Sequence, residues 1–316
     1  MTDLQKWVEQ IRGGEVRALA RAISAVENQT AEALPLLRLL FPFSGQARIL
    51  GLTGAPGAGK STLVDQLARA YRKQNCTLGI VAVDPTSPYS GGAILGDRIR
   101  MQAHAGDPGI YIRSMATRGE LGGLARATAD VATVLDASGR DLVLIETVGV
   151  GQDEVDIVRL ADVTVVVLVP GMGDDVQTIK AGIMEIADVF AINKSDRDGA
   201  ERVEREIRNM QSMAHRQDGW EPPVVKTVAS TGQGIDELAA AIDSYRDFLI
   251  AGNLVLQKKV ENWRDRLREM LRESVLQRVL QEQLGAGTLL QYASEIAEHQ
   301  RDPYTLVDEL LGSWTR

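Results

Sequence analysis

One stretch decides the fold of this 316-residue chain: Gly54-Ala55-Pro56-Gly57-Ala58-Gly59-Lys60-Ser61. It matches the spacing Gly-x4-Gly-Lys-Ser/Thr. The apolar run at 47–53 predicts a buried strand before it, and the pattern at 60–73 predicts a helix after it. Glycines let backbone N–H groups turn toward phosphate oxygens, and the N-terminus of a helix adds partial positive charge. Because both flanks are present, a chance match in a glycine-rich chain is disfavoured, and a phosphate-binding loop is predicted.

The side chains at the end of this loop have separate expected roles. Lys60 is expected to supply a mobile cation to the β- and γ-phosphates of a nucleotide. Ser61 offers a hydroxyl to Mg²⁺, the metal that accompanies such phosphates. The backbone N–H groups from Gly54 to Thr62 are expected to face the phosphate oxygens.

A second motif, Asn193-Lys194-Ser195-Asp196, follows an apolar run at 189–192. A carboxylate at Asp196 can accept hydrogen bonds from N1–H and N2–H₂ of guanine, and adenine lacks that pair of donors. The stem of Lys194 can pack along the base, and Asn193 can brace the loop. Four residues alone have weak specificity, and a polar turn after a strand is the alternative. Because the motif follows a later strand of the same predicted sheet as the phosphate loop, the two motifs together favour guanine nucleotides over ATP.

The bulk composition excludes several classes of partner. The formal net charge of −8 argues against non-specific binding to nucleic acid or to acidic membrane surfaces. The single cysteine, Cys76, allows no intrachain disulfide and favours a reducing cytoplasm. The three histidines are scattered, so no transition-metal site is expected within one chain. Neither a signal peptide nor an apolar run of transmembrane length is recognised.

The pattern along the chain predicts an α/β fold with three parts. These are an N-terminal helical extension over 1–45, a nucleotide-binding domain over 46–250 and a C-terminal helical arm over 251–316. Strands expected at 47–53, 78–83, 109–113, 141–146, 163–169, 188–192 and 223–228 are mostly continuous apolar runs. Such runs are typical of strands buried on both faces, so we expect a mostly parallel sheet with helices on both sides. The intervening helices are expected near 60–73, 97–105, 121–137, 153–160, 175–186, 198–216 and 234–250.

The C-terminal part has an apolar stripe on a long charged helix, from Trp263 to Leu284. Packing of this stripe against its own domain is one interpretation, and an oligomerisation arm is the other. Because the helix follows a completed sheet domain, the arm is favoured. Nothing after about residue 250 is then expected to be needed for nucleotide binding.

Three acidic residues are expected to converge on the phosphates. Asp84 ends the second predicted strand, Asp97 lies in the following segment, and Glu146 ends the fourth strand in Glu146-Thr-Val-Gly149. Ligands of such sheets bind beyond the carboxyl ends of the strands. Ordinary GTPases have Asp-x-x-Gly at the last position. Glu146 would therefore supply a longer carboxylate for Mg²⁺ or water, and Gly149 an amide for the γ-phosphate. Helix capping or a turn is the alternative for Asp84 and Asp97.

With these motifs, nearly the whole chain resembles the MeaB/ArgK group of P-loop GTPases. The stretches that carry the resemblance, besides the phosphate loop and Asn-Lys-Ser-Asp, are Val83-Asp-Pro-Thr-Ser-Pro88, Ile94-Leu-Gly-Asp-Arg-Ile-Arg-Met101, Gly119-Glu-Leu-Gly-Gly-Leu124 and Glu146-Thr-Val-Gly-Val-Gly-Gln-Asp-Glu154. Members of this group are G-protein chaperones of adenosylcobalamin-dependent methylmalonyl-CoA mutase and its relatives.

The resemblance implies a homodimer formed through the C-terminal arm, and GTP-dependent gating of cofactor delivery to the mutase, including rescue of a damaged mutase. By the same match, Ser61, Asp84, Asp97 and Glu146 line the Mg²⁺ site, and Lys180 lies in a mobile switch loop. The base-reading loop matches Val228-Ala-Ser230-Thr-Gly232 only loosely. An adenosyltransferase is a further candidate partner. Direct binding of cobalamin is not implied, and the identity of the mutase stays open.

Three other functions remain alternatives at this point, one of them a nucleotide-gated scaffold with negligible turnover. A kinase of the kind named for arginine transport would need a second substrate pocket, which the sequence does not reveal. A metal-insertion GTPase would need a cluster of Cys and His that the sequence lacks. Hydrolysis by the chain alone is expected to be slow, because Val150 stands where a water-orienting glutamine would follow Gly149.

Overall fold

The computed structural model describes residues 2–84, 104, 106–116, 123–147, 160–171, 186–213, 216, 218–282, 284 and 287–312. Its internal contacts divide the chain into two compact units, Met1–Asn262 and Trp263–Arg316. The first unit contains the sheet and all the motifs singled out above. The boundaries of the three expected parts stay a prediction.

The core of the first unit is a seven-stranded sheet in the order β3-β2-β4-β1-β5-β6-β7, in which every pairing is parallel. The strands are β1 (Arg48–Gly54), β2 (Leu78–Asp84), β3 (Ile110–Ala116), β4 (Leu142–Glu146), β5 (Val163–Leu168), β6 (Val189–Ile192) and β7 (Val224–Lys226). The predicted α/β fold with a parallel sheet is therefore confirmed. β1, which leads into the phosphate loop, lies between β4 and β5 near the centre.

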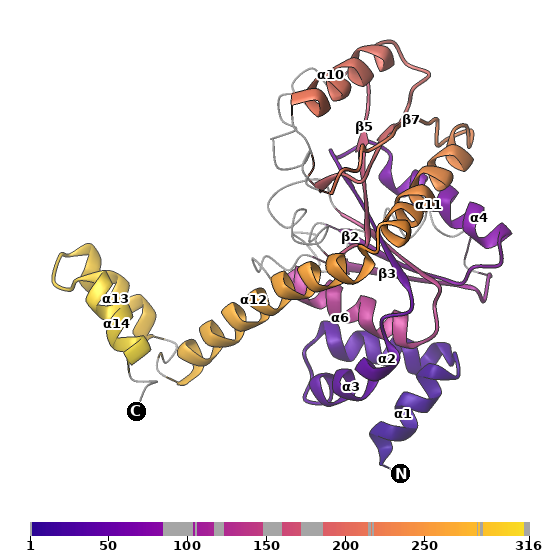
Figure 1. The fold of residues 1–316 in the computed structure, drawn as a ribbon. Helices are drawn as coiled ribbons and strands as arrows, with labels where there is room; N and C mark the ends of the chain where they lie inside the picture. The colour runs from indigo at the N-terminus through magenta and orange to yellow at the C-terminus, as the bar shows by residue number, and fades with distance from the viewer. Residues whose placement is uncertain are drawn as a thin grey trace. The chain divides into compact units, whose positions relative to one another are not determined.

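Alternate residues of each strand enter different cores, as the period of two in a strand requires. Leu142 and Leu144 of β4 join a core with α4 (Lys60–Lys73) and α11 (Ile235–Ala251). Val143 and Ile145 join a second core with α6 (Gly123–Ala137). Figure 1 shows α4 and α11 beside each other, away from α6. The sheet is thus covered on both faces, which accounts for its uninterrupted apolar strands.

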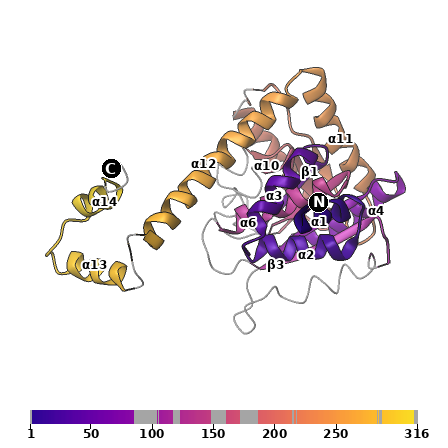
Figure 2. The ribbon, with the colours of Figure 1, turned by 90° about the horizontal axis from the view of Figure 1, so that it is seen from below.

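Three N-terminal helices complete the second core. α1 (Asp3–Arg12), α2 (Val16–Glu27) and α3 (Ala33–Leu40) bury Ile11, Ile23 and Leu36 completely against one another and α6, and Figure 2 shows them gathered at one side of the sheet. A short 3-10 turn, η1 (Phe41–Phe43), leads to β1. The expected helical N-terminus is present, and its apolar residues belong to the core that covers the sheet.

The remaining cover comes from α10 (Ala200–Met213), which packs Val203 and Ile207 on Val166, Leu168 and Phe190. The helices expected at 153–160 and 175–186, and nearly all of the one expected at 97–105, lie outside the described residues.

The first two turns of α12 (Val255–Glu282) are held to the amino-terminal end of the sheet. Lys258 Nζ lies 3.8 Å from Asp188 Oδ2, directly before β6. Lys259 Nζ donates to the carbonyl of Gly45, before β1, at 3.1 Å. Asn262 Nδ2 donates to the carbonyl of Ala161, before β5, at 3.2 Å. These contacts join the start of α12 to the edge of the sheet opposite the phosphate loop.

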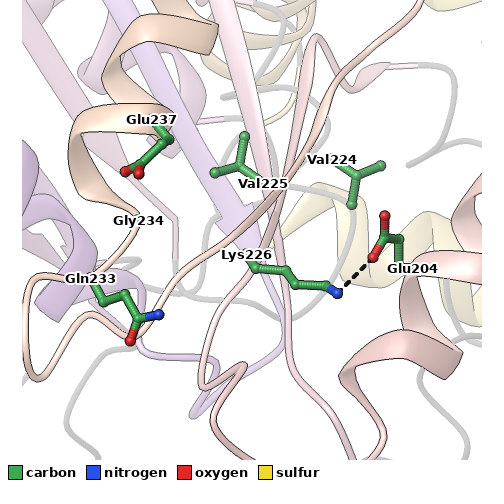
Figure 3. Close-up of a pocket in the computed structure, with 7 residues that line it drawn as sticks. All are labelled: Glu204, Val224, Val225, Lys226, Gln233, Gly234 and Glu237. Carbon is green, nitrogen blue, oxygen red and sulfur yellow. Dashed lines mark ion pairs between the residues drawn. The ribbon is translucent and has the colours of Figure 1, made fainter.

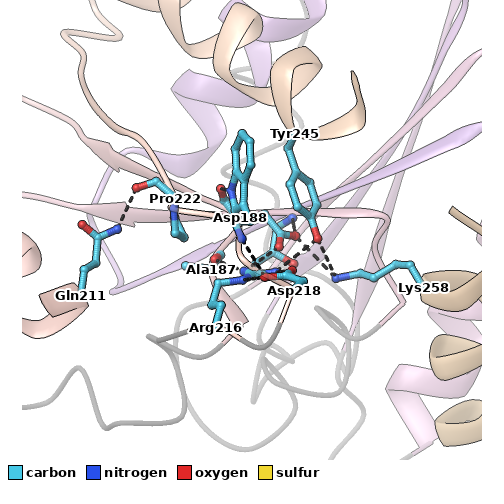
Figure 4. Close-up of polar contacts among 10 residues, drawn as sticks. Ala187, Asp188, Gln211, Arg216, Asp218, Pro222, Tyr245 and Lys258 are labelled. Atoms are coloured by element: carbon cyan, nitrogen blue, oxygen red, sulfur yellow. Dashed lines mark hydrogen bonds and ion pairs between the residues drawn. The ribbon is translucent and has the colours of Figure 1, made fainter. Parts of the chain in front are cut away.

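Asp188 is the most buried charge in this group. It accepts a hydrogen bond from Arg216 at 2.9 Å and one from the backbone N–H of Thr164, also at 2.9 Å. Figure 4 shows Lys258 directed at Asp188 and Tyr245, with Arg216 beside Asp188. Burial raises the pKa of the Tyr245 hydroxyl, which accepts from Lys258 as a neutral group. A buried carboxylate needs such partners, so Lys258 of α12 contributes to the stability of the first unit.

The second unit contains the rest of α12 together with α13 (Thr288–Ala297) and α14 (Pro303–Gly312). Arg301 ties α13 to α14 through Glu295 at 3.5 Å and Glu309 at 2.6 Å. Large apolar side chains of this unit are exposed: Trp263, Leu267, Leu271, Leu276, Leu289, Leu290, Tyr304, Val307 and Leu311. Among the described helices none combines the length and the apolar character needed to cross a bilayer.

Candidate nucleotide-binding site

The phosphate loop connects β1 to α4 and depends on three left-handed glycines. Gly54, Gly57 and Gly59 have φ of 142°, 77° and 89°, conformations that L side chains rarely adopt. A Cβ at Gly54 would also lie 2.2 Å from the carbonyl oxygen of Val167 on β5. The glycine therefore permits the close approach of β1 and β5 at the point where the loop begins. Thr62 lies in the first turn of α4, where backbone N–H groups have no partner within the helix.

Lys60 is the first residue of α4 and points back into the loop. Its Nζ donates to the carbonyl of Gly54 at 2.6 Å and to that of Ala55 at 3.1 Å, and the side chain is buried. A buried ammonium at a helix N-terminus, within a glycine loop, is an arrangement suited to binding the β- and γ-phosphates.

Ser61 and Glu146 meet at the carboxyl ends of the central strands. Ser61 Oγ donates to Glu146 Oε1 at 2.6 Å, and both side chains are buried. A hydroxyl and a carboxylate are the hard oxygen donors that Mg²⁺ prefers, so this pair fits the expected metal.

The other expected metal ligands are only partly within the described residues. Asp84 ends β2, whose Ala82 pairs with Glu146, so its backbone lies at the same edge of the sheet. The side chain of Asp84, and the whole of Asp97, Gly149 and Lys180, lie outside the described part. Among the described residues no group of three or more His, Cys, Asp or Glu could hold a metal ion.

Asn193 connects the phosphate loop to the expected base-reading loop. Its Nδ2 donates to the carbonyl of Ala58 at 2.8 Å. Its Oδ1 accepts from the N–H of Ala229 at 3.1 Å and from the hydroxyl of Thr227 at 3.3 Å. The side chain is almost fully buried. One amide therefore fixes three segments that are far apart in the sequence.

Lys194 makes a second connection to the phosphate loop. Its Nζ donates to the carbonyl of Gly57 at 2.7 Å, and its φ is +55°, unusual for a residue with a side chain. Backbone strain of this kind is found where a site holds a residue in place. Asp196 and Ser230 are both exposed.

No individual role was expected from the sequence for Thr227, for the backbone of Ala229, or for the buried pair Thr53 and Thr147. Thr227 and Ala229 act through Asn193, and Ala229 does so with its backbone, which no residue type reveals. The hydroxyl of Thr147, the residue after Glu146, lies 3.1 Å from that of Thr53 at the end of β1. This bond holds together the two strand ends that carry the phosphate loop and Glu146.

A separate pocket lies at the outer edge of the sheet, on β7. Its lining includes Glu204, Lys226, Gln233 and Glu237, and Figure 3 shows Lys226 directed at Glu204, 2.9 Å away. None of its lining residues belongs to the phosphate loop or to Asn193–Asp196, so this pocket is distinct from the nucleotide site. The Lys226–Glu204 pair neutralises part of the charge of the pocket.

Comparison with known proteins agrees with this geometry. The family model described as "Methylmalonyl Co-A mutase-associated GTPase MeaB" matches residues 19–284. A putative GTPase of Pyrococcus abyssi is 46% identical over 98% of this chain and 96% of its own length. GTPase ArgK of Escherichia coli is 35% identical over 86% of this chain and 85% of its own.

Two further similarities extend the comparison. The mitochondrial methylmalonic aciduria type A homolog of Mus musculus is 33% identical over 86% of this chain and 71% of its own. A crystal structure described as a LAO/AO transport system kinase superposes with a TM-score of 0.73 at 27% identity, covering 100% of this chain and 99% of its own.

Proposed function

We propose, from the premise that this chain belongs to the MeaB family of methylmalonyl Co-A mutase-associated GTPases, that it is the GTP-dependent chaperone of an adenosylcobalamin-dependent acyl-CoA mutase. The chain is a GTPase, as its family and its relatives are named. Methylmalonyl-CoA mutase is the first candidate partner, because the family description and the mouse relative both refer to methylmalonyl metabolism.

One observation carries the nucleotide-binding part of the proposal, namely the bridge that Asn193 makes from Ala58 to Ala229. It joins a loop suited to phosphates with a loop suited to a base. The distance between the two halves of the site is therefore set by the protein before a nucleotide binds. Asp196, Ser230 and the stem of Lys194 are proposed to bind the guanine base.

Mg²⁺ would be held by Ser61 and Glu146, with Asp84 and Asp97 as further proposed ligands, and it supplies positive charge that balances the phosphates. Lys60 is proposed to add a second cation from the opposite side of the loop. The N–H of Gly149 is proposed to bind the γ-phosphate. These groups lower the cost of developing negative charge, which is the main task of a protein in phosphoryl transfer.

The proposed coupling to the mutase rests on the lack of a water-orienting glutamine after Gly149. Val150 follows Gly149 where a glutamine could have oriented water, so hydrolysis is expected to be slow without a partner. Contact with the mutase would order Lys180 and the carboxylates around the γ-phosphate. Hydrolysis would then license delivery of the cofactor, or its replacement when damaged. An adenosyltransferase that supplies the cofactor is a further proposed partner, and a cytoplasmic location is proposed from the single cysteine.

We also propose that the second unit forms a homodimer. Leu267, Leu271 and Leu276 of α12 are each more than half exposed, as are Leu289 and Leu290 of α13. Contiguous apolar side chains on a small helical unit are typical of a protein interface. Light scattering of the full chain at several concentrations tests this directly.

A protein or amino-acid kinase is the second candidate, because the superposed crystal structure is described as a transport system kinase. The two functions differ in the acceptor of the γ-phosphate. Incubating the chain with γ-labelled GTP, with and without candidate proteins and arginine, distinguishes them. Label released only as inorganic phosphate supports the proposal, and label transferred to an acceptor supports the kinase.

A further inference from the structure

His104 is a buried histidine beside the helix that begins at the phosphate loop. It retains only 7% of its exposed surface, and its Nε2 lies 2.6 Å from Asp65 Oδ1 on α4. The two atoms are within ion-pair distance for a protonated imidazole, but the contact does not have the geometry of a hydrogen bond. The other oxygen of Asp65 lies 3.1 Å from Arg69. The sequence gave this histidine no role, and the nucleotide site described above does not use it.

The position of Asp65 connects His104 to the metal site. Asp65 follows Ser61 by one turn of α4, so the two side chains lie on the same face of the helix. Ser61 is the residue whose hydroxyl bonds to Glu146. In the sequence, His104 lies seven residues after Asp97, in the connection between β2, which ends at Asp84, and β3.

A second ion pair holds the same connection two turns further along α4. Arg72 binds Asp107 with two hydrogen bonds, of 2.8 Å and 2.9 Å. These bonds hold the pKa of Asp107 below its usual range. Asp107 is more exposed than His104, and its partner Arg72 lies far from Ser61 along α4. The chain thus has one pair next to the metal ligand and one distant pair for comparison.

We propose that His104 and Asp65 are a positioning pair for Ser61, and through it for the magnesium ion of the GTPase. Within the described residues, the ion pair of the His104 side chain is with Asp65, so His104 would act on the metal indirectly. Holding Asp65 fixes the rotation and the depth of the first turns of α4, and therefore the direction of the Ser61 hydroxyl. Partners of metal ligands that lie one contact further out commonly change metal affinity by about 10- to 100-fold. The inference rests on the proposed magnesium site.

Among the described residues, the charged groups near His104 are Asp65 with its partner Arg69, and Asp107 with its partner Arg72. Asp65, Arg69 and Arg72 lie on α4, and Asp107 lies in the segment before β3. Removing the imidazole leaves Arg69, which is half exposed, as the ion-pair partner of Asp65 among the described residues. The carboxylate would then be free to turn outward toward Arg69, and the turn of α4 between Ser61 and Asp65 would be held less firmly.

The test measures release of a fluorescent GDP analogue from the full chain as Mg²⁺ is titrated. His104→Ala and Asp65→Asn are expected to raise the Mg²⁺ concentration for half-maximal slowing of release by about 10-fold. GDP affinity without Mg²⁺ is expected to stay within about twofold of the unmodified chain. His104→Lys, which retains a positive charge that can face Asp65, is expected to recover most of the response. Asp107→Asn is the control: it breaks the distant pair, so its melting temperature falls while its Mg²⁺ response stays normal.

Each outcome has one meaning. If the unmodified chain does not respond to Mg²⁺, the proposed metal site is wrong. If it responds and folded His104→Ala responds equally, the positioning pair is wrong and the metal site stands. If Asp107→Asn shifts the Mg²⁺ response as much as His104→Ala, the effect belongs to the general packing of the segment, which also contradicts the proposal.

Discussion

The side chain of Asn193 occupies the space that a side chain at Gly59 would need. A Cβ built at Gly59 would lie 2.4 Å from Asn193 Nδ2, well inside contact distance. Asn193 cannot move aside easily, because Ala58, Thr227 and Ala229 hold its amide. The glycine of the phosphate motif and the asparagine of the base motif are therefore one packed unit. The position of the Asn193 amide requires a glycine at 59, because a side chain there would overlap it.

We expect Gly59→Ala to disrupt both halves of the nucleotide site. The left-handed backbone costs an alanine about 1–2 kcal/mol, and displacing Asn193 costs about 1 kcal/mol for each hydrogen bond lost. Gly139→Ala is the matched control, because Gly139 has φ of +83° with no atom within 4 Å of a Cβ. Urea unfolding and a GDP titration should show that both variants lose stability while only Gly59→Ala loses GDP. Equal GDP affinity in the two variants would contradict the packed unit.

Base specificity is expected to rest on Asp196. Asp196→Asn replaces an acceptor by a donor opposite the N1–H and N2–H₂ groups of guanine. Losing two hydrogen bonds to a charged group should weaken GDP binding by about 3 kcal/mol or more, roughly 100-fold. Xanthine, with an oxygen at position 2, should then bind better than guanine.

Calorimetric titration with GDP and XDP checks the change at Asp196. Asp198→Asn, in the same exposed loop, is the control and should keep the preference for GDP. A preference for GDP in Asp196→Asn would remove Asp196 from the base site.

Glu146 is expected to matter for hydrolysis and for Mg²⁺ more than for folding. Glu146→Gln keeps an oxygen that can accept the bond from Ser61 but removes the charge. GTP hydrolysis should fall by about 100-fold, and the effect of Mg²⁺ on GDP release should largely disappear. The melting temperature should stay close to that of the unmodified chain. A variant with normal hydrolysis would show that Glu146 is only a structural partner of Ser61.

The end of the nucleotide-binding unit can be tested with two truncations. A chain that ends at Asn262 keeps Lys258, Lys259 and their contacts, so it should be monomeric and bind GDP with normal affinity. A chain that ends at Gly252 leaves Asp188 without Lys258, and it should lose about 1–3 kcal/mol of stability. Light scattering, urea unfolding and a GDP titration measure the three properties. If the chain that ends at Asn262 is still a dimer, the proposal that the second unit forms the dimer is wrong.

Much of this fold could be read from local patterns. The seven strands could be predicted because most of them are short apolar runs with turn residues at their ends, as is typical of buried parallel strands. The phosphate loop and Asn193–Asp196 follow strands as expected, and their roles toward phosphates and guanine stay predictions from residue type and spacing. The expected bracing role of Asn193 agrees with its contacts to Ala58 and Ala229.

The contacts between distant segments could not be read in this way. His104, in the connection between β2 and β3, pairs with Asp65 of α4, and neither stands in a recognisable pattern. Lys258 looks like any exposed lysine of a charged helix until the fold brings it to Asp188. The left-handed backbone of Lys194 follows from its tertiary contacts, since its side chain alone disfavours that conformation.

The central claim is that a mutase controls the GTPase activity of this chain. Single-turnover hydrolysis of GTP, measured with and without adenosylcobalamin-dependent acyl-CoA mutases, tests it most directly. The account predicts slow hydrolysis by the chain alone and a rate at least about 10-fold higher with the mutase it serves, equivalent to about 1.4 kcal/mol of transition-state stabilisation. Rates that are the same with and without every candidate mutase would contradict it.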